Sequence, residues 1–347
     1  MSSRYILIVN SRKVTRPVFV IGAPHSGVAE VGTALKLSPG FHVTIGQPAV
    51  LQAVHGFARR PSLFHARGTA AVSVVRDAFA QAWQLTPTGC LHCTAQCRAA
   101  AGLTAGEVGP CAELRGLARY GDATPDLAYC AEELIEAFPD AQVVQVVRDG
   151  RDAVAGMLGD VQVMSWYRPS VINLDTEFPN PFYGVEDEFD RSAWNAASAA
   201  GKCALRWRWA VRLAARLRKE VPDDQLKTLR YEDMVRSPGS AAAALSEFTG
   251  VKVAAPVVPA NRKSRGEASS WRRVLSSAQV ADIDQVAGEE LRRLGYADNK
   301  ALPRLAGAAS RALRAGGAPG PRCRAAACPS PRRAGQVLRA RPGTALA

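Results

Sequence analysis

The chain has 347 residues, of which 47% are hydrophobic and 22% are charged, and its formal net charge is +13. This charge does not indicate a specific nucleic-acid binder, because residues 304–347 hold nine arginines and no acidic residue, which leaves +4 for the first 303. No segment approaches 18 unbroken apolar residues, and the first apolar run is too short for a secretory signal, so we expect a cytoplasmic protein without a membrane span.

Four short runs rich in β-branched residues precede helix-like stretches and are predicted to be strands: residues 17–22, 42–46, 142–147 and 226–230. Strands that alternate with helices indicate a mostly parallel sheet that is covered on both faces. The first and third runs are almost wholly apolar, which is typical of central parallel strands. The sequence therefore predicts one α/β domain.

Three stretches carry a helical pattern. Residues 124–138 begin with a threonine cap and a proline, and are expected to cross over the sheet into the strand at 142–147. Residues 191–220 predict a long helix that bears three tryptophans. Residues 278–294 predict an amphipathic helix that ends at Gly295.

A cysteine-rich segment, residues 85–115, interrupts this alternation. The spacing of its cysteines suits a tetrahedral zinc site, with Cys90, Cys93, Cys97 and Cys111 as the ligands. Thiols in an insertion and a redox pair are the alternatives. A disulfide framework is not expected in a chain of this length without a secretory signal.

Residues 160–190 form a second irregular segment, with six aromatic residues among prolines, asparagines and acids. A long segment of this kind inside a compact domain predicts a functional lid, and aromatic side chains that hold a loop on the core are an equally good interpretation. Residues 304–347 are rich in Ala, Gly, Pro and Arg and predict a disordered tail.

The turn after the first strand, at residues 22–29, has the layout of a phosphate-binding loop. Gly22 and Gly27 let main-chain N–H groups converge at a helix N-terminus, and Ser26 adds a hydroxyl. Val28 and Ala29 stand where a nucleotide-binding loop has lysine and a metal-binding hydroxyl, which disfavours magnesium-dependent phosphoryl transfer and hence a kinase or NTPase. A tight strand-to-helix turn without a ligand is the alternative.

A second candidate anion site follows the strand at 142–147, where Arg148 stands immediately after the last apolar residue. Ligands gather at the carboxyl ends of parallel strands, so we expect Arg148 to share a crevice with the loop at 22–29. Arg230 ends the last strand in the same way, but Glu232 and Asp233 explain it as the partner of a helix start.

In their order, these segments resemble sulfotransferases that use 3′-phosphoadenosine 5′-phosphosulfate (PAPS), of the bacterial and Golgi-like branch. The resemblance covers about residues 17–297 and is carried by four blocks: 17–35, 121–157, 229–251 and 269–296. It implies a P-loop-like three-layer fold over residues 1–303, a reaction that needs no metal, and transfer of a sulfuryl group to a hydroxyl or amine of a carbohydrate, lipid or natural-product acceptor. It indicates no oligomeric state.

The resemblance also implies site residues. The residues that would hold the 5′-phosphosulfate are Gly22, Ala23, Pro24, His25, Ser26, Gly27 and Val28. Arg148 would bind the 3′-phosphate, and Arg262, Trp271 and Arg272 would close over the nucleotide. His25 is the candidate catalytic residue, either as a cation or as an acid–base group.

The chain departs from the family pattern at several of these positions. His25 replaces the arginine of the loop, and residues expected to be hydroxyl-bearing, cationic or acidic are replaced by Val28, Ala29, Gln47, Ala123 and Gly156. These losses favour the alternative of an impaired relative that binds nucleotide or acceptor without turnover. His42, His55 and His65 lie in the segment that would flank the acceptor, and one of them is expected to replace the missing carboxylate base.

Overall fold

The computed structural model describes residues 6–86, 89–90, 93–104, 107, 109–256 and 270–296, and at residues 63–69 and 89–90 it describes the backbone alone. The elements given below all belong to the unit Met1–Asn299. The tail predicted over 304–347, and Arg262, lie outside the described residues.

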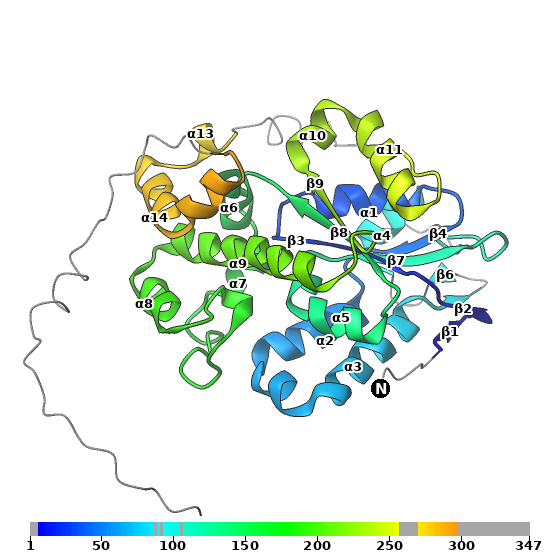
Figure 1. The fold of residues 1–347 in the computed structure, drawn as a ribbon, viewed down its shortest axis with the longest axis horizontal. Coiled ribbons are helices and arrows are strands. Elements are labelled where there is room, and N and C mark those ends of the chain that lie inside the picture. Colours follow the sequence, from blue (N-terminus) through cyan, green and yellow to red (C-terminus); the bar gives the residue numbers. More distant parts are fainter. Residues whose placement is uncertain are drawn as a thin grey trace, which may run out of the picture. The chain divides into compact units, whose positions relative to one another are not determined.

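A five-stranded parallel sheet, in the order β4-β7-β3-β8-β9, forms the centre of the described chain (Figure 1). The strands are β3 (Val18–Gly22), β4 (Phe41–Thr44), β7 (Arg119–Ala123), β8 (Gln142–Val147) and β9 (Leu226–Arg230). Val18 pairs with Gly121 on one side and with Gln142 on the other. The α/β class, the parallel sheet and the four predicted strands are therefore confirmed.

The fifth strand, β7, was not predicted, because its sequence, RYGDA, lacks an apolar pattern. It is nevertheless buried throughout. A β-carbon at Gly121 would lie 2.6 Å from Val18 O, so only glycine allows this close approach to β3. Asp122 is fully buried and accepts a hydrogen bond of 2.5 Å from Thr44 Oγ1. Polar partners on the neighbouring strand thus compensate for the polar sequence.

Burial raises the pKa of Asp122 to about 7 from an ordinary value of 3.8. Between these values the folded chain keeps a proton that the unfolded chain has lost, so stability falls as pH rises through this window. The free energy of unfolding of the wild type should fall relative to Asp122→Asn by up to about 4 kcal/mol between pH 4 and pH 8. Urea unfolding at a series of pH values measures this difference. Asp175→Asn is the control, because the Asp175 side chain is 99% exposed. The same pH dependence of the unfolding free energy in Asp122→Asn and Asp175→Asn would contradict the prediction.

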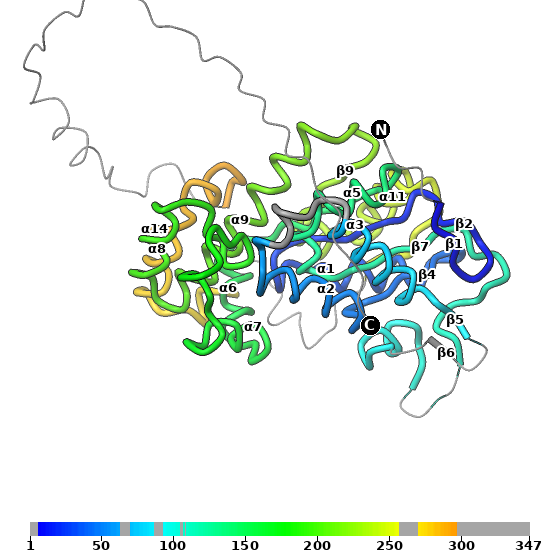
Figure 2. Tube along the Cα trace, turned by 90° about the horizontal axis from the view of Figure 1, so that it is seen from below, coloured from blue at the N-terminus to red at the C-terminus, as the bar shows by residue number. Residues whose placement is uncertain are grey.

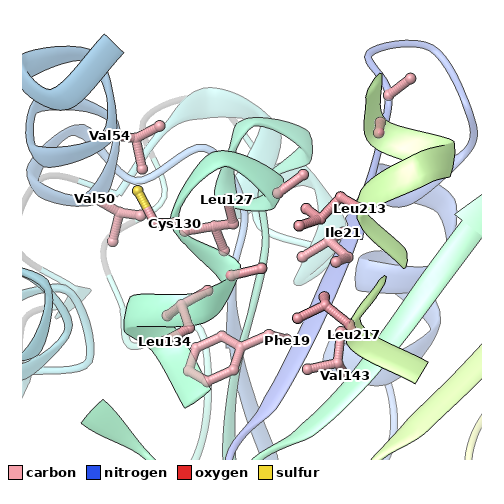
Figure 3. Close-up of a cluster of buried hydrophobic side chains, with 14 of the residues drawn as sticks. Phe19, Ile21, Val50, Val54, Leu127, Cys130, Leu134, Val143, Leu213 and Leu217 are labelled. Carbon is pink, nitrogen blue, oxygen red and sulfur yellow. The ribbon is translucent and has the colours of Figure 1, made fainter. Parts of the chain in front are cut away.

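The alternation of side chains on β3 divides the core into two. Phe19 and Ile21 face a cluster built with α2 (Pro48–Arg59), α3 (Ser62–Ala82), α5 (Ala131–Ala137) and α9 (Ala199–Glu220), part of which is drawn in Figure 3. Val18 and Val20 face a second cluster, built with α1 (Val28–Lys36), α4 (Ala95–Ala100), α10 (Tyr231–Arg236) and α11 (Pro238–Thr249). The sheet lies between these two helical layers (Figure 1).

The predicted helices form with changed boundaries. The segment 124–138 is a 3-10 helix, η1 (Pro125–Cys130), followed by α5. The segment 191–220 is divided into α8 (Glu188–Ala196) and α9, because the Ser198 side chain caps a new helix start by accepting from Gly201 N. The predicted helix 278–294 is α14 (Ser277–Arg293), and Gly295 follows with a φ of 73°.

The aromatic segment 160–190 contains α7 (Val161–Ser165) and η2 (Pro181–Tyr183). Phe182, Tyr183 and Trp194 are buried and form a third apolar cluster with Leu205 of α9. Phe189 is 76% exposed. Most of the aromatic side chains thus hold the segment on α9, and its function as a lid stays a prediction.

Two short hairpins accompany the main sheet: β1 (Ile8–Val9) with β2 (Arg12–Lys13), and β5 (Leu85–Thr86) with β6 (Gly89–Cys90). Figure 2 shows them at the end of the unit away from α8 and α14. Two further helices are α6 (Gly150–Leu158), which follows β8, and α13 (Trp271–Val274), which precedes α14. None of the described helices is long and apolar enough to cross a membrane.

Candidate functional site

The loop between β3 and α1 has an unusual backbone. His25 has a φ of 63° and Gly27 a φ of 102°. A β-carbon on Gly27 would lie 2.4 Å from the Tyr231 ring, and one on Gly22 would lie 2.6 Å from Val146 O. Neither glycine can be replaced without moving a neighbour, so this loop conformation is tightly specified.

Ser26 is the buried hydroxyl of this loop. Its side chain is 1% exposed, and its Oγ has no hydrogen-bond partner among the described residues. Its main-chain N–H donates to Ala23 O at 3.1 Å, which closes a tight turn. A buried hydroxyl without a partner is uncommon in a folded protein and is consistent with a ligand that accepts or donates at this position.

Arg148 lies against this loop, immediately after β8. Its Nη1 donates to His25 O at 3.1 Å, and its guanidinium lies 4.3 Å from the centre of the Tyr231 ring. The side chain is buried at 8% exposure. The structure thus brings Arg148 and the glycine loop together at the carboxyl edge of the sheet, where ligands bind in open α/β folds.

The turn that carries Arg148 is fixed from several sides. Trp207 Nε1 of α9 donates to Arg148 O at 3.1 Å, and a β-carbon on Gly150 would lie 2.8 Å from the same indole. Asp149 N donates to Glu232 Oε1 at 2.9 Å, and Asp149 forms a two-bond ion pair with Arg151. These contacts hold the arginine backbone in one position.

Glu232 and Tyr231 are site residues that the sequence did not assign. Glu232 accepts from Asp149 N and, at 2.9 Å, from the hydroxyl of Tyr296. Arg230 donates to Leu294 O at 2.7 Å and stacks on Tyr296 at 4.4 Å, instead of pairing with the acids that follow it. The RYE sequence gave no signal for these contacts, because they depend on where the end of α14 returns.

Trp271 is brought to the same turn by α13. Its main-chain N–H donates to Asp152 Oδ1 at 2.8 Å, and the Ser270 hydroxyl donates to the same oxygen at 2.8 Å. The guanidinium groups of Arg151 and Arg272 lie 4.3 and 4.4 Å from the Trp271 ring centre. Trp271 is 8% exposed, and Arg272 is exposed, so the arginine is accessible to a ligand.

His25 pairs with a residue that the sequence did not indicate. Its Nε2 lies 3.0 Å from Asp160 Oδ2, with both side chains about one-third exposed. Burial would raise the pKa of Asp160, but hydrogen bonds from Val163 N, His25 and Gln162 N outweigh it, and the pKa is lowered. Asp160 therefore stays ionised at neutral pH and favours the imidazolium form of His25.

Gly156 explains how His25 reaches Asp160. A β-carbon on Gly156 would lie 2.6 Å from His25 Cγ. The imidazole therefore passes over this glycine, and the position has no room for the serine of the family pattern. The residue types at positions 25 and 156 are therefore sterically coupled.

Gly156→Ser is expected to lower the free energy of unfolding by about 1–3 kcal/mol, because the new side chain overlaps His25 and breaks its pair with Asp160. In a His25→Asn background, where a shorter side chain is tolerated at positive φ, the loss should largely disappear. A double-mutant cycle by urea unfolding measures the coupling. Gly239→Ser is the control, since a β-carbon there meets nothing within 4 Å, and an equal loss for both glycines would contradict the prediction.

His55 forms a second histidine–carboxylate pair, on α2. Its Nε2 lies 3.1 Å from Asp126 Oδ2, and Asp126 Oδ1 accepts from Arg206 at 2.6 Å. The His55 side chain is 32% exposed and meets Trp166 edge-on at 4.9 Å. Burial would raise the pKa of Asp126, but Arg206 and His55 outweigh it, and the pKa is lowered. A histidine held by an ionised carboxylate is the geometry of an oriented base.

The other residues singled out in the sequence lie elsewhere. His42 is fully buried on β4 and lies beside Cys111, whereas the side chain of His65 is outside the description. Gln47 and Ala123 are buried near the ends of β4 and β7. Among the three histidines proposed for the acceptor side, His55 is the one with a described carboxylate partner.

The chain is thus an α/β protein with a parallel sheet between two helical layers, and a glycine loop and an arginine lie together at the carboxyl edge of that sheet. Residues 17–180 match the model of the sulfotransferase family, which confirms the resemblance to sulfotransferases over this part of the chain. The match contains both the loop and Arg148. No match was found among curated proteins.

Several solved structures are similar over most of the chain. The sulfotransferase domain of the Synechococcus PCC 7002 olefin synthase is 16% identical, with 84% of this chain and 97% of that chain covered and a TM-score of 0.40. Sulfotransferase STF9 from Mycobacterium avium is 14% identical, covering 81% and 77%, with a TM-score of 0.38. A sulfotransferase from Alicyclobacillus acidocaldarius is 17% identical, covering 79% and 97%, with a TM-score of 0.37.

Proposed function

We propose that the protein transfers a sulfuryl group from PAPS to a hydroxyl or amine of a carbohydrate, lipid or natural-product acceptor. The observation that carries the proposal is the contact between the β3–α1 loop and Arg148 at the carboxyl edge of the sheet. A guanidinium and converging main-chain N–H groups at one edge suit a nucleotide with phosphates at two places.

The residues of the site fit the donor. The main-chain N–H groups of residues 23, 25, 27 and 28 and the unpartnered Ser26 hydroxyl would hold the 5′-phosphosulfate, and Arg148 the 3′-phosphate. Trp271 and Arg272 would cover the nucleotide from α13. PAPS supplies the sulfuryl group, and an imidazolium at His25 would stabilise charge that develops on the leaving phosphate oxygen. Asp160 would hold His25 in that protonation state.

His55 is the proposed general base. η1 follows β7 and α2 follows β4, so Asp126 and His55 both come after carboxyl ends of neighbouring strands. Asp160, the partner of His25, and Trp166, which contacts His55, stand at the two ends of α7. They are six residues apart, or about 9 Å along a helix axis. His55 and His25 would therefore flank the space in which donor and acceptor meet, with Asp126 stabilising the imidazolium that forms on proton abstraction.

A pocket of about 300 Å³ is lined by Tyr129 and Phe182, the two rings that the Arg206 guanidinium contacts, and is proposed to take the acceptor. Aromatic and acidic side chains line it, among them Phe57, Tyr129, Phe182, Glu186 and Trp209. Aromatic faces suit the apolar face of a sugar or a polyketide, and the carboxylates suit its hydroxyl or amine groups.

The test is transfer of radiolabelled sulfate from PAPS to a cell extract, followed by separation of labelled products. Labelled product that requires the protein supports turnover. A protein that binds PAP, the product nucleotide, but labels nothing would be the impaired relative instead. Magnesium-dependent ATP turnover without sulfate transfer would contradict both.

His55→Gln should lower the rate of label transfer by about 10²–10⁴-fold, because the acceptor proton then has no base, while PAP affinity stays unchanged. Asp126→Asn should lower the rate and also change its pH profile, since the imidazolium loses its stabilising charge. The measurement is the initial rate for the product that the wild type labels. Unchanged transfer by His55→Gln would exclude His55 as the base and leave the PAPS assignment intact.

A further inference from the structure

Three cysteines meet beside β4, on the side of the sheet that carries α1 and α4. The sulfur atoms of Cys93, Cys97 and Cys111 all lie within 4.8 Å of one another. Cys97 and Cys111 are buried, and Cys93 is half-buried. Tetrahedral zinc with bonds of about 2.3 Å to sulfur places two sulfurs about 3.8 Å apart, so a shift of about 1 Å completes the geometry.

The segment that carries Cys93 and Cys97 is fixed to β4 by a capped helix start. Thr94 Oγ1 accepts from Cys97 N at 3.1 Å and donates to Ile45 O at 2.9 Å. Cys97 Sγ lies 4.0 Å from Val43 O. Cys111 comes to the same place from the far end of the 85–115 segment, so the three thiols join two ends of one insertion to the sheet.

His42 of β4 is the candidate fourth ligand; it lies beside Cys111 but outside the group of ligand atoms that are all within 4.8 Å of one another, so its ring would have to move toward Cys93 and Cys97 on binding. Its Nδ1 lies 4.0 Å from Cys111 Sγ, and the side chain is fully buried. On tetrahedral zinc a sulfur and a nitrogen lie about 3.6 Å apart, close to the observed separation. His42 also packs edge-on against Tyr120, with ring centres 6.0 Å apart, and its Nε2 has no hydrogen-bond partner among the described residues.

The charge of the surroundings also suits a zinc–thiolate site. Lys36, at the end of α1, is 6% exposed; it donates to Val43 O at 2.8 Å and interacts with Cys111. Zinc with three thiolates and one neutral imidazole has a net charge of −1, which the ammonium group of Lys36 would balance. A buried lysine beside three thiols is otherwise expensive, because buried charges in proteins are paired.

We propose that Cys93, Cys97, Cys111 and His42 Nδ1 bind a structural zinc ion that fastens the 85–115 insertion to β4. Four protein ligands leave no open position, so the ion would be structural. This set keeps three cysteines of the sequence prediction and replaces Cys90, whose side chain is outside the description, by a histidine from the sheet. The proposal does not depend on the sulfuryl-transfer assignment.

The first test is the metal content of the full chain, purified under reducing conditions from zinc-supplemented cells. The wild type should hold one zinc per chain by elemental analysis, and replacement by Co²⁺ should give a thiolate-to-metal absorption band. Cys97→Ser, Cys111→Ser and His42→Ala should lose the metal. Cys203→Ser is the matched control, because Cys203 is as deeply buried on α9, and it should keep the full zinc content.

Cys90→Ser separates the two ligand sets. Loss of zinc in Cys90→Ser together with full zinc in His42→Ala would overturn the His42 assignment. Alkylation of the wild type needs no variant, so unfolding of a variant cannot affect its result. Cys93, Cys97 and Cys111 should be protected from alkylation and become reactive after the metal is removed by a chelator. No zinc, no cobalt band and no change in protection on chelation would overturn the proposal.

Discussion

Arg148→Ala should lower the affinity for PAP by about 100-fold or more. In the proposed role the guanidinium makes two charge-assisted hydrogen bonds to the 3′-phosphate, each worth about 1.5–3 kcal/mol. A loss of about 3 kcal/mol corresponds to about 100-fold in the dissociation constant. Isothermal titration of both proteins with PAP measures it.

Arg148 also donates to His25 O, so its loss can act through the loop as well as on the nucleotide. A second ligand, 5′-AMP, separates these effects because it lacks the 3′-phosphate. Its affinity should change little in Arg148→Ala, and an equal loss for both nucleotides would show that Arg148 acts by supporting the loop. Arg191→Ala, on α8, is the control for removal of a cation, and equal PAP binding by Arg148→Ala and the wild type would refute the assigned role.

Strands such as β3 and β8 could be predicted because a short apolar run shows where a buried strand lies in the sequence, whichever strands it pairs with. β3 and β8 need no partner to be recognised, since every residue of each is buried in the sheet. β7 could not be found in this way. Its burial depends on Thr44 for Asp122 and on the close approach of Gly121 to β3, and neither contact has a signal within the segment.

The site shows the same division. The glycine loop and Arg148 are local features at strand ends, so sequence order placed them together. The partners of the histidines lie 135 residues away for His25 and 71 for His55. The sequence indicates Gly156 only as the loss of a serine, whereas the structure shows that this glycine leaves space for the His25 ring. Sequence predicts which side chains can do chemistry, and the fold determines which of them are paired.

Arg206 has the second large expected effect, on stability. It is 1% exposed and donates to Asp126 Oδ1 at 2.6 Å and to the Tyr129 hydroxyl at 2.7 Å. Its guanidinium also lies 4.1 Å from the Phe182 ring centre. Arg206→Met should lower the free energy of unfolding by about 3–5 kcal/mol, because Asp126 is left as a largely buried carboxylate without its main cation.

The pH dependence gives this prediction its sign. Asp126 with its lowered pKa stabilises the wild type above the unfolded value of about 4, and this contribution is lost as pH falls through the folded pKa. Without Arg206, burial raises the pKa of Asp126 instead. The loss of unfolding free energy in Arg206→Met should therefore be largest at neutral pH and smaller near pH 4. Adding Asp126→Asn should recover part of it at neutral pH.

Urea unfolding at pH 7 and pH 4 provides the measurement, with Arg216→Met as the matched control. Arg216 lies on the same helix and pairs with Glu186, but its side chain is 42% exposed, so its loss should cost less than about 1 kcal/mol. A small, pH-independent loss in Arg206→Met would mean that Asp126 does not need the arginine to stay ionised. His55 would then be oriented by a carboxylate that water, rather than Arg206, keeps charged, and the three residues would not act as one unit.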